Sequence, residues 1–332
     1  MLGSESRLEC ALVSACPTQK INLRRSSIFL TLLALVQGCQ LTDHLTSDST
    51  FSIQPLNTLA WIDREGHEVP INIPARNYIY AQLSPDGKQV ALNSRDESSD
   101  IWIFDLQLES LRRLTFDSSP NIAPLWAPDG RLAYTRVIDG TQEIILQVAD
   151  RSEPAELLSI LSNNAKYPTS FTADGQTLIY HTSTFGYDIW SVSLEEETNS
   201  AQQLLANPDY RETNGALSPD ERWLAYESDE SGQLEIYVSP FPDVYSAGVQ
   251  ISDGGGSRPR WHPDGSELFY IKQHESELTG ALMAVSINDD PSFSHGTPEL
   301  LFENNFIAPN AGRQVYDISA DGQRFLMIQN DH

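Results

Sequence analysis

A short turn motif repeats six times along the chain, each time with an Asp at its centre and a strand of large apolar residues behind it. The spacings between successive motif Asp residues are 43, 45, 46, 44 and 57 residues. A period in the low forties, made of strands and turns, is typical of propeller blades that hold four strands each. The chain is therefore predicted to be all-β, a six-bladed β-propeller. The six Asp residues are Asp86, Asp129, Asp174, Asp220, Asp264 and Asp321.

The motif has the composition of a tight hairpin turn, as in SPDG at positions 84–87. Proline presets φ, Asp accepts hydrogen bonds from nearby backbone amides, and glycine takes the left-handed conformation that follows. Ala173 and Ala320 replace the proline in two repeats, which a type I turn tolerates. Glu221 replaces the glycine in one repeat, so strain is expected there. We interpret the six Asp residues as turn residues rather than catalytic or metal-binding ones.

After each hairpin, an acidic residue introduces a third strand that mixes β-branched and aromatic side chains. This composition suits a half-buried pleated surface. Short apolar segments further on predict a fourth strand in each unit, and no long stretch has helical periodicity. The third strands begin at Asp100, Glu143, Asp188 and Glu235.

The two ends of the repeating segment complement each other. The chain finishes with an inner hairpin that has no third or fourth strand after it, whereas the repeats open with LAWIDREGHEVPI, which has the pattern of a third and a fourth strand. We therefore predict that residues 58–73 pair with residues 315–329 to complete the sixth blade. Such a closure leaves no open gap in the ring.

The longer spacing before the last repeat falls on an excursion around residues 287–314, rich in Asn, Pro and Gly. We expect this excursion to be a loop that projects over one face.

Several segments resemble the TolB-type propeller family, whose repeat centres on Trp-Ser-Pro-Asp-Gly followed by an apolar strand. They are LWAPDGRLAY, RWHPDGSELFY and DIWIFDL. The opening LAWIDREG and the ending YDISADGQRFLMI are also similar to propeller sensor regions found behind kinase or winged-helix domains in bacterial multidomain proteins. The resemblance implies protein or ligand binding in the cell envelope. This implication is an analogy of fold, and a fold does not fix a function.

Residues 1–39 have the pattern of a secretory leader. Basic residues at 20, 24 and 25 precede a nine-residue apolar run at 28–36, which is too short to span a bilayer. The run ends in Val-Gln-Gly-Cys, which resembles a lipobox with Cys39 as the lipid attachment site. A lipoprotein is the favoured interpretation, with a soluble secreted protein and an uncleaved anchor as alternatives. We expect translation to start near Leu23.

Beyond the leader, residues 40–56 are polar and are predicted to be a flexible tether to the propeller at 57–330. All three cysteines lie within the leader, so the propeller needs no disulfide. We expect a periplasmic or envelope protein, held at the membrane through Cys39 if that residue is processed.

The net charge of −25 restricts the partners. An acidic surface repels phosphate backbones, so no nucleic-acid partner is expected. We attribute the charge to solubility, with steering of basic proteins or cations as the alternative. The expected partners are envelope proteins bound by a monomeric propeller without a cofactor.

Binding is predicted at one face of the ring. We name it the channel-mouth face and define it by the loops that lead into the innermost strands and those that join second to third strands. Arg and Tyr gather in the first set of loops, and these residue types often anchor interfaces. The alternative for each residue is loop capping or pairing with a nearby carboxylate. The candidates are Arg76, Tyr78, Asn121, Tyr167, Asn214, Arg258, Arg260 and Arg313.

The sequence holds none of the common hydrolase signatures. It has no Gly-x-Ser-x-Gly elbow, and its seven histidines show neither His-x-His nor His-Glu-x-x-His spacing. His181 and His274 are the weak candidates for a metal site assembled from distant blades. We therefore expect a non-catalytic binding scaffold. A sensor for a sugar, peptide or wall fragment and a propeller lyase or hydrolase with a metal site remain the alternatives.

Overall fold

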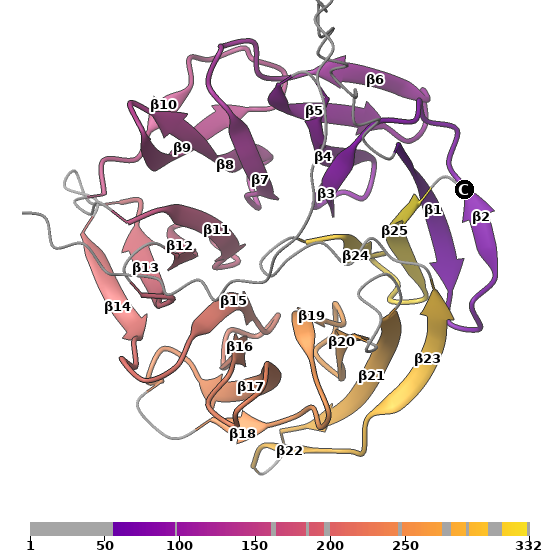
Figure 1. Cartoon of the computed structure of the whole chain (residues 1–332), viewed down its shortest axis with the longest axis vertical. Helices are drawn as coiled ribbons and strands as arrows, with labels where there is room; N and C mark the ends of the chain where they lie inside the picture. The colour runs from indigo at the N-terminus through magenta and orange to yellow at the C-terminus, as the bar shows by residue number, and fades with distance from the viewer. Residues whose placement is uncertain are drawn as a thin grey trace, which may run out of the picture. The chain divides into compact units, whose positions relative to one another are not determined.

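The computed structural model contains six sheets arranged around a central axis (Figure 1). It describes residues 56–96, 98–160, 164–183, 186–195, 200–244, 248–273, 280–289, 292–304 and 314–330. Every regular element in these ranges is a strand. The prediction of an all-β, six-bladed propeller is therefore confirmed.

Each of the first four blades is an antiparallel meander that runs from the centre outward. Blade 1 contains β3 (Tyr78–Leu83), β4 (Gln89–Arg95), β5 (Ser99–Asp105) and β6 (Ser110–Arg113), and blade 2 contains β7 (Asn121–Trp126), β8 (Arg131–Ile138), β9 (Thr141–Val148) and β10 (Glu156–Leu157). Blade 3 contains β11 (Lys166–Phe171), β12 (Thr177–Thr182), β13 (Ile189–Ser193) and β14 (Ala201–Leu205), and blade 4 contains β15 (Glu212–Leu217), β16 (Trp223–Ser228), β17 (Glu235–Pro240) and β18 (Val249–Gln250).

Blade 5 differs in its outer part. After β19 (Ser257–Trp261), β20 (Glu267–Gln273) and β21 (Gly280–Asn288), both β22 (Ser294–His295) and β23 (Glu299–Asn304) pair with β21. The expectation that residues 287–314 form only a loop is therefore wrong. The segment ELLFE has the apolar content of an outer strand, and Phe302 packs in the core.

Blade 6 is built from both ends of the propeller. Its sheet order is β2 (Glu68–Pro70), β1 (Asn57–Asp63), β25 (Arg324–Asn330) and β24 (Tyr316–Ile318). All seven residues of β1 pair with β25, from Asn57 with Asn330 to Asp63 with Arg324. The predicted closure is confirmed.

The closing sheet lies within the largest apolar cluster of the described chain. That cluster joins side chains of blades 5, 6 and 1, including Leu59 of β1 and Phe325 of β25. The ring of Phe325 meets Phe269 of blade 5 edge-on, with centroids 5.1 Å apart. Arg64, in the turn after β1, also forms a two-pronged contact with Glu267 of blade 5, at 2.7 and 2.8 Å. The joint is therefore held by packing and by charge as well as by its ladder.

The six motif Asp residues act as turn residues. Each accepts a hydrogen bond from the backbone N–H two positions ahead, as Asp174 does from Gln176 at 2.9 Å. Glu221, which stands in the glycine position, has φ of +58°. Its carboxylate accepts a hydrogen bond from the backbone N–H of Ala173 in blade 3. The strain expected at this turn is confirmed.

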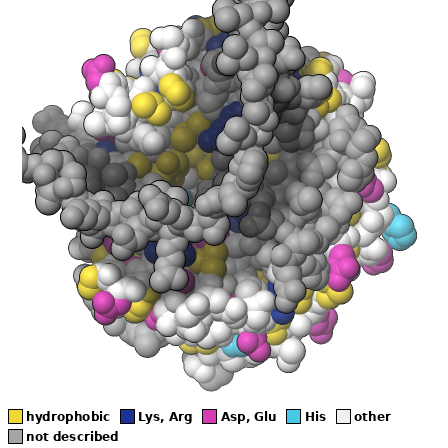
Figure 2. Space-filling view, viewed as in Figure 1, with side chains coloured by type: hydrophobic (Ala, Val, Ile, Leu, Met, Phe, Trp, Pro, Cys, Tyr) yellow, Lys and Arg dark blue, Asp and Glu magenta, His cyan; other side chains and the backbone are white. Residues whose placement is uncertain are grey.

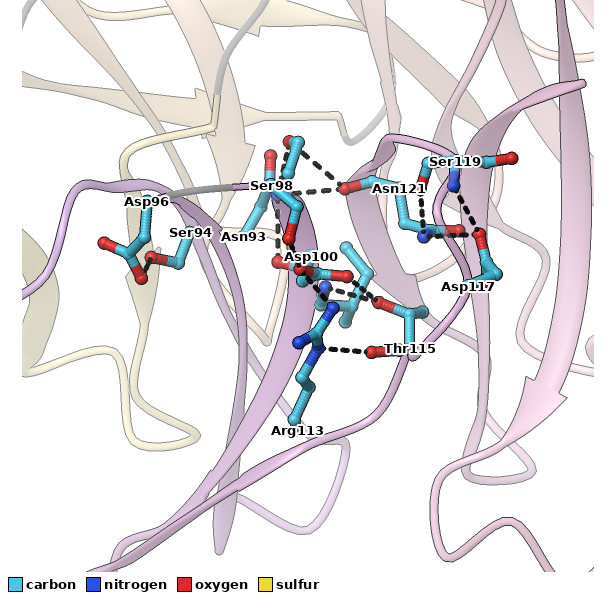
Figure 3. A network of polar contacts seen from close by, with 12 residues as sticks. Asn93, Ser94, Asp96, Ser98, Asp100, Arg113, Thr115, Asp117, Ser119 and Asn121 are labelled. Carbon is cyan, nitrogen blue, oxygen red and sulfur yellow. Dashed lines mark hydrogen bonds and ion pairs between the residues drawn. The ribbon is translucent and has the colours of Figure 1, made fainter.

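The acid that opens the third strand also has a structural role. Asp100 is buried, accepts a hydrogen bond from Thr115 and forms an ion pair with Arg113 at 2.7 Å (Figure 3). Glu235 of blade 4 accepts in the same way from Ser252, at the end of the fourth strand. These contacts fasten the outer strand of a blade to its third strand.

Truncation after residue 314 should remove cooperative unfolding, because it deletes β24 and β25 and leaves β1 without its partner. Truncation after residue 330 is the matched control and should unfold like the full chain. Thermal melts followed by circular dichroism compare the three chains. If the chain truncated after residue 314 melts cooperatively at the full-length temperature, the closure does not support the ring.

Candidate binding site in the central channel

The innermost strands are irregular where they face the channel. Five of them, β3, β7, β11, β15 and β19, contain a shift of register with the second strand of their blade. At three of these bulges the backbone is left-handed, with φ of +54° at Ala123, +52° at Asn214 and +58° at Arg258. Bulges re-aim side chains, and residues held with positive φ concentrate at functional sites. The irregularity therefore marks the channel wall as the candidate site.

The upper part of the channel, beside the channel-mouth face, encloses a cavity of about 30 Å³. Its polar lining consists of amides, hydroxyls and aromatic rings, with one guanidinium. In the space-filling view along the channel, several Lys and Arg side chains are visible near the centre, whereas most of the visible acidic ones lie nearer the rim (Figure 2). The polar and aromatic lining residues are Tyr80, Gln82, Tyr167, Thr169, His181, Asn214, Arg260 and Gln314.

One side of this cavity is a stacked pair of rings. Tyr167 lies against His181 with ring centroids 5.2 Å apart. His181 is buried, and burial lowers its pKa to about 4. Its Nδ1 accepts a hydrogen bond from the backbone N–H of Asn214 at 3.4 Å, which fits the neutral ring. This side of the cavity therefore carries no charge at neutral pH.

Asn214 and Arg258 are linked through one buried carboxylate. Glu227 accepts hydrogen bonds from the Asn214 side chain at 2.7 Å and from the Arg258 backbone N–H at 2.6 Å. Arg258 is itself fully buried, and the hydroxyl of Tyr316 donates to its carbonyl at 2.7 Å. Arg258 is thus part of the wall between blades 4, 5 and 6.

The other predicted residues of the first two blades also serve the scaffold. Arg76 forms an ion pair with Asp96 at 2.6 Å and lies 4.2 Å above the ring of Trp102. The hydroxyl of the buried Tyr78 donates a hydrogen bond to the backbone carbonyl of Pro74. Asn121 is buried in the polar network between blades 1 and 2 (Figure 3). The structure therefore brings Tyr167, Asn214 and Arg260 to the cavity, and places the remaining described candidates elsewhere. Arg313, His274 and Cys39 lie outside the described residues.

Below this cavity, a second hollow of about 350 Å³ opens among the hairpin turns of blades 3, 4 and 5. Arg260 lines both spaces, and Asp317 of β24 lines the lower one. Burial raises the pKa of Asp317, and the charge of Arg260 opposes that rise. Arg260 is thus the only cationic side chain that lines either space within the described chain.

Several cavity residues were missed by sequence reasoning. Gln82, Thr169 and Gln314 carry no motif. Gln82 and Thr169 lie on the bulged strands β3 and β11, and Gln314 lies just before β24. Their position within the repeat could have located two of them, because Gln82 and Thr169 precede the motif Asp of their repeats by four and five positions. Equivalent positions of the other repeats face the same axis.

Within the described ranges, one group of side chains has the spacing to hold a metal ion, formed by Asp63, Glu65 and His67. Its geometry is that of a turn, because Asp63 accepts the backbone N–H of Glu65 at 3.0 Å and of His67 at 2.8 Å. His181 is not part of that group. In the same ranges, no helix is long and apolar enough to cross a membrane.

A separate pair of hollows, of about 360 and 580 Å³, lies between blades 3 and 4 and shares Tyr210. Glu212 at the start of β15 is buried beside them and accepts a hydrogen bond from the backbone N–H of Asn207 at 2.9 Å. Burial, together with the nearby charges of Asp188 and Glu230, raises the pKa of Glu212 to about 7. This carboxyl group therefore titrates near neutral pH.

Several solved structures of other proteins have a similar fold. Similar solved structures include a TolB of Agrobacterium tumefaciens, with a TM-score of 0.67, 19% identity and coverage of 84% of this chain and 99% of that one. TolB of Acinetobacter baumannii has a TM-score of 0.56, 15% identity and coverage of 83% and 65%. An oligogalacturonate lyase in complex with manganese has a TM-score of 0.51, 13% identity and coverage of 83% and 96%. At these identities the likeness shows a TolB-like fold.

Among curated proteins, Dipeptidyl-peptidase 5 of Porphyromonas endodontalis is 22% identical over an alignment of 260 residues, and the match covers 59% of this chain. The chain spans 37% of the length of that protein. A scan against protein-family models found no match. The resemblance to kinase-linked sensor regions stays a prediction.

Replacing His181 by Gln should reduce the loss of stability in mild acid. The folded protein holds this ring neutral, with a pKa of about 4 against 6.5 for the ordinary group, so the unfolded chain binds more protons between those values. Stability therefore falls as pH drops from 6.5 to 4, by up to about 3 kcal/mol from this group. Urea unfolding across this range measures the slope, with the exposed His295→Gln as control. An unchanged slope in H181Q would contradict the assignment.

Replacing Glu212 by Gln should act in the opposite direction. Its folded pKa is raised from 4.5 to about 7, so the folded protein binds more protons in that window, and stability falls as pH rises through it. Relative to the parent protein, E212Q should therefore be more stable at pH 8 than at pH 4.5. The same urea titrations provide the measurement. Parallel stability curves for the two proteins would show that Glu212 ionises equally easily in the folded and unfolded chains.

Proposed function

We propose that this propeller is a non-catalytic binding scaffold that holds a partner protein at its channel-mouth face. The observation that carries the proposal is the set of five bulged inner strands. They turn amide, hydroxyl and aromatic side chains towards one cavity, in a ring that its own termini close. A rigid scaffold with irregular backbone at one end is the arrangement on which proteins commonly place recognition.

The chemistry of the lining supports binding rather than catalysis. The upper cavity pairs tyrosine rings with amides, which suits contact with a polypeptide. His181 is stacked and neutral, and its Nδ1 accepts a hydrogen bond from backbone, so the ring carries its proton on Nε2 and is not set to act as a base. Metal-dependent chemistry like that of a lyase would need several ligands, and His181 is the only histidine of the described chain that lines either channel space.

The cellular setting of the proposal comes from the leader. A basic region, a short apolar run and Cys39 favour export and attachment to a membrane by lipid, with residues 40–56 as tether. We place the partner in the cell envelope for this reason. The propeller would then present its channel at a limited distance from the membrane surface, as a monomer.

The test replaces Tyr167 by Ala, because this ring lies at the cavity and its truncation removes a contact of the type that anchors interfaces. Envelope extract of the source organism is passed over the immobilised propeller, and the affinity of each captured protein is then measured with purified components. Y167A should weaken the specific partner at least about tenfold. Leu108→Ala is the matched control, since Leu108 is exposed in the turn between β5 and β6, away from the channel-mouth face.

A thermal melt of Y167A confirms that the variant propeller still folds. If Y167A and L108A bind the partner equally well, the channel-mouth face is not the interface. Turnover of a peptide or oligosaccharide by the purified propeller, abolished by a substitution in the channel, would contradict the non-catalytic assignment.

A further inference from the structure

The guanidinium of Arg260 lacks a full set of hydrogen-bond acceptors within the described residues. Its side chain is 17% exposed and lies between the two channel spaces. The buried Nε has no hydrogen-bond partner, and the nearest carboxylate oxygen of the described chain, in Asp317, is 3.9 Å away. A guanidinium carries five N–H donors, and leaving donors unsatisfied in a buried setting is unfavourable. The guanidinium therefore keeps donor capacity for an acceptor bound in the channel.

Asp317 lies too far away to act as that acceptor, because its nearest oxygen is 3.9 Å from the Arg260 Nε and its side chain is held by two backbone N–H groups. The backbone N–H of Leu83 donates to Oδ2 at 2.8 Å, and that of Ile318 donates to Oδ1 at 2.9 Å. Asp317 therefore fastens β3 to β24 across the joint between blades 1 and 6. It balances the charge of Arg260 from a distance and leaves the donors of the guanidinium available.

The size and the lining of the upper cavity indicate which kind of acceptor group would bind beside Arg260. A volume of about 30 Å³ suits a small group such as the tip of a carboxylate side chain. The surrounding groups are neutral at pH 7, so Arg260 is the charge that a ligand in this cavity meets. Arg and carboxylate match each other in shape, with two parallel N–H···O bonds.

We propose that the channel recognises a carboxylate of the partner protein, an Asp or Glu side chain or a C-terminus, which enters the upper cavity and binds the guanidinium of Arg260. This inference rests on the proposed function and names the chemical group that the partner presents. Tyr167 and Asn214 then contact the polypeptide around that carboxylate. Because the protein is strongly acidic, the carboxylate is recognised at short range inside the channel and not by long-range attraction.

The test uses two peptides that differ in one group, acetyl-Gly-Glu-Gly-amide and acetyl-Gly-Gln-Gly-amide. Each is titrated into the full propeller labelled with nitrogen-15 in arginine, and the Nε–H signals are followed by NMR. The Arg260 signal, assigned from its loss in Arg260→Gln, should shift saturably with the Glu peptide. A single contact of this kind predicts a dissociation constant of about 1 mM. The Gln peptide should bind at least about tenfold more weakly.

Two variants and one control complete the experiment. R260Q should abolish the difference between the peptides, and Arg260→Lys should keep part of it, because lysine retains the charge but not the planar fork. The control is Arg211→Gln, since Arg211 pairs with Asp229 at 2.8 Å outside the channel. If R260Q leaves Asp317 uncompensated and lowers the melting temperature, the double variant R260Q with D317N is used in its place. Equal shifts with both peptides, or binding of the Glu peptide by R260Q, would overturn the inference.

The failure of this inference can be told apart from failure of the proposed function. With the captured partner, R260Q should weaken binding about tenfold or more, in parallel with Y167A. If Y167A weakens binding of the partner protein and R260Q does not, the channel-mouth face binds the partner without recognising a carboxylate. If neither variant changes the affinity, the proposed function fails as well.

Discussion

The backbone ladder between β1 and β25 is the interaction on which the rest of the structure depends. A propeller blade contacts only its neighbours, so an open ring would expose the inner hairpin of one end blade and the outer strands of the other. Pairing seven residues from each end removes both exposed edges and buries Leu59 and Phe325 in a core shared by three blades. The hydrogen bond from the backbone N–H of Leu83 to Asp317 fastens the neighbouring contact between blades 1 and 6 on the channel side. The geometry of the channel is therefore set partly by the meeting of the two ends.

Much of this fold could be predicted from sequence because its signals are local. A Pro-Asp-Gly hairpin sets its own backbone conformation, so six copies in phase specify six blades, and the incomplete units at the two ends specify the closure. Two features could not be predicted in this way. The outer strand β23 pairs with β21 across the connection DDPSFSHGTP, whose Asp, Ser, Pro and Gly residues by themselves indicate a loop. The roles of Asp100 and Glu235 depend on hydroxyls that reach them from the fourth strand.

In the candidate site, the contrast between what the sequence predicts and what only the structure shows is sharper. Composition predicted Arg, Tyr and Asn in the loops before the inner strands, whereas the structure places Tyr167, Asn214 and Arg260 within β11, β15 and β19 themselves. Burial then separates residues that look alike in sequence. Arg258 and Arg260 are two positions apart, yet Arg258 is enclosed in the wall whereas Arg260 lines the channel. The bulge in β19 causes this difference, because it changes which side chains face the axis. Gln82 and Gln314 reach the cavity without any motif, so only the structure identifies them.

Hydrogen exchange of the backbone amides at the joint tests the central claim most directly. In a ring closed by β1 and β25, the amides of Ala60 and Met327 exchange only through global unfolding, with the same free energy as those of the inner strands of blades 2, 3 and 4. The predicted result is a common protection level across the joint and these blades. Exchange of Ala60 and Met327 through an opening of much lower free energy, with the other blades still protected, would contradict the account.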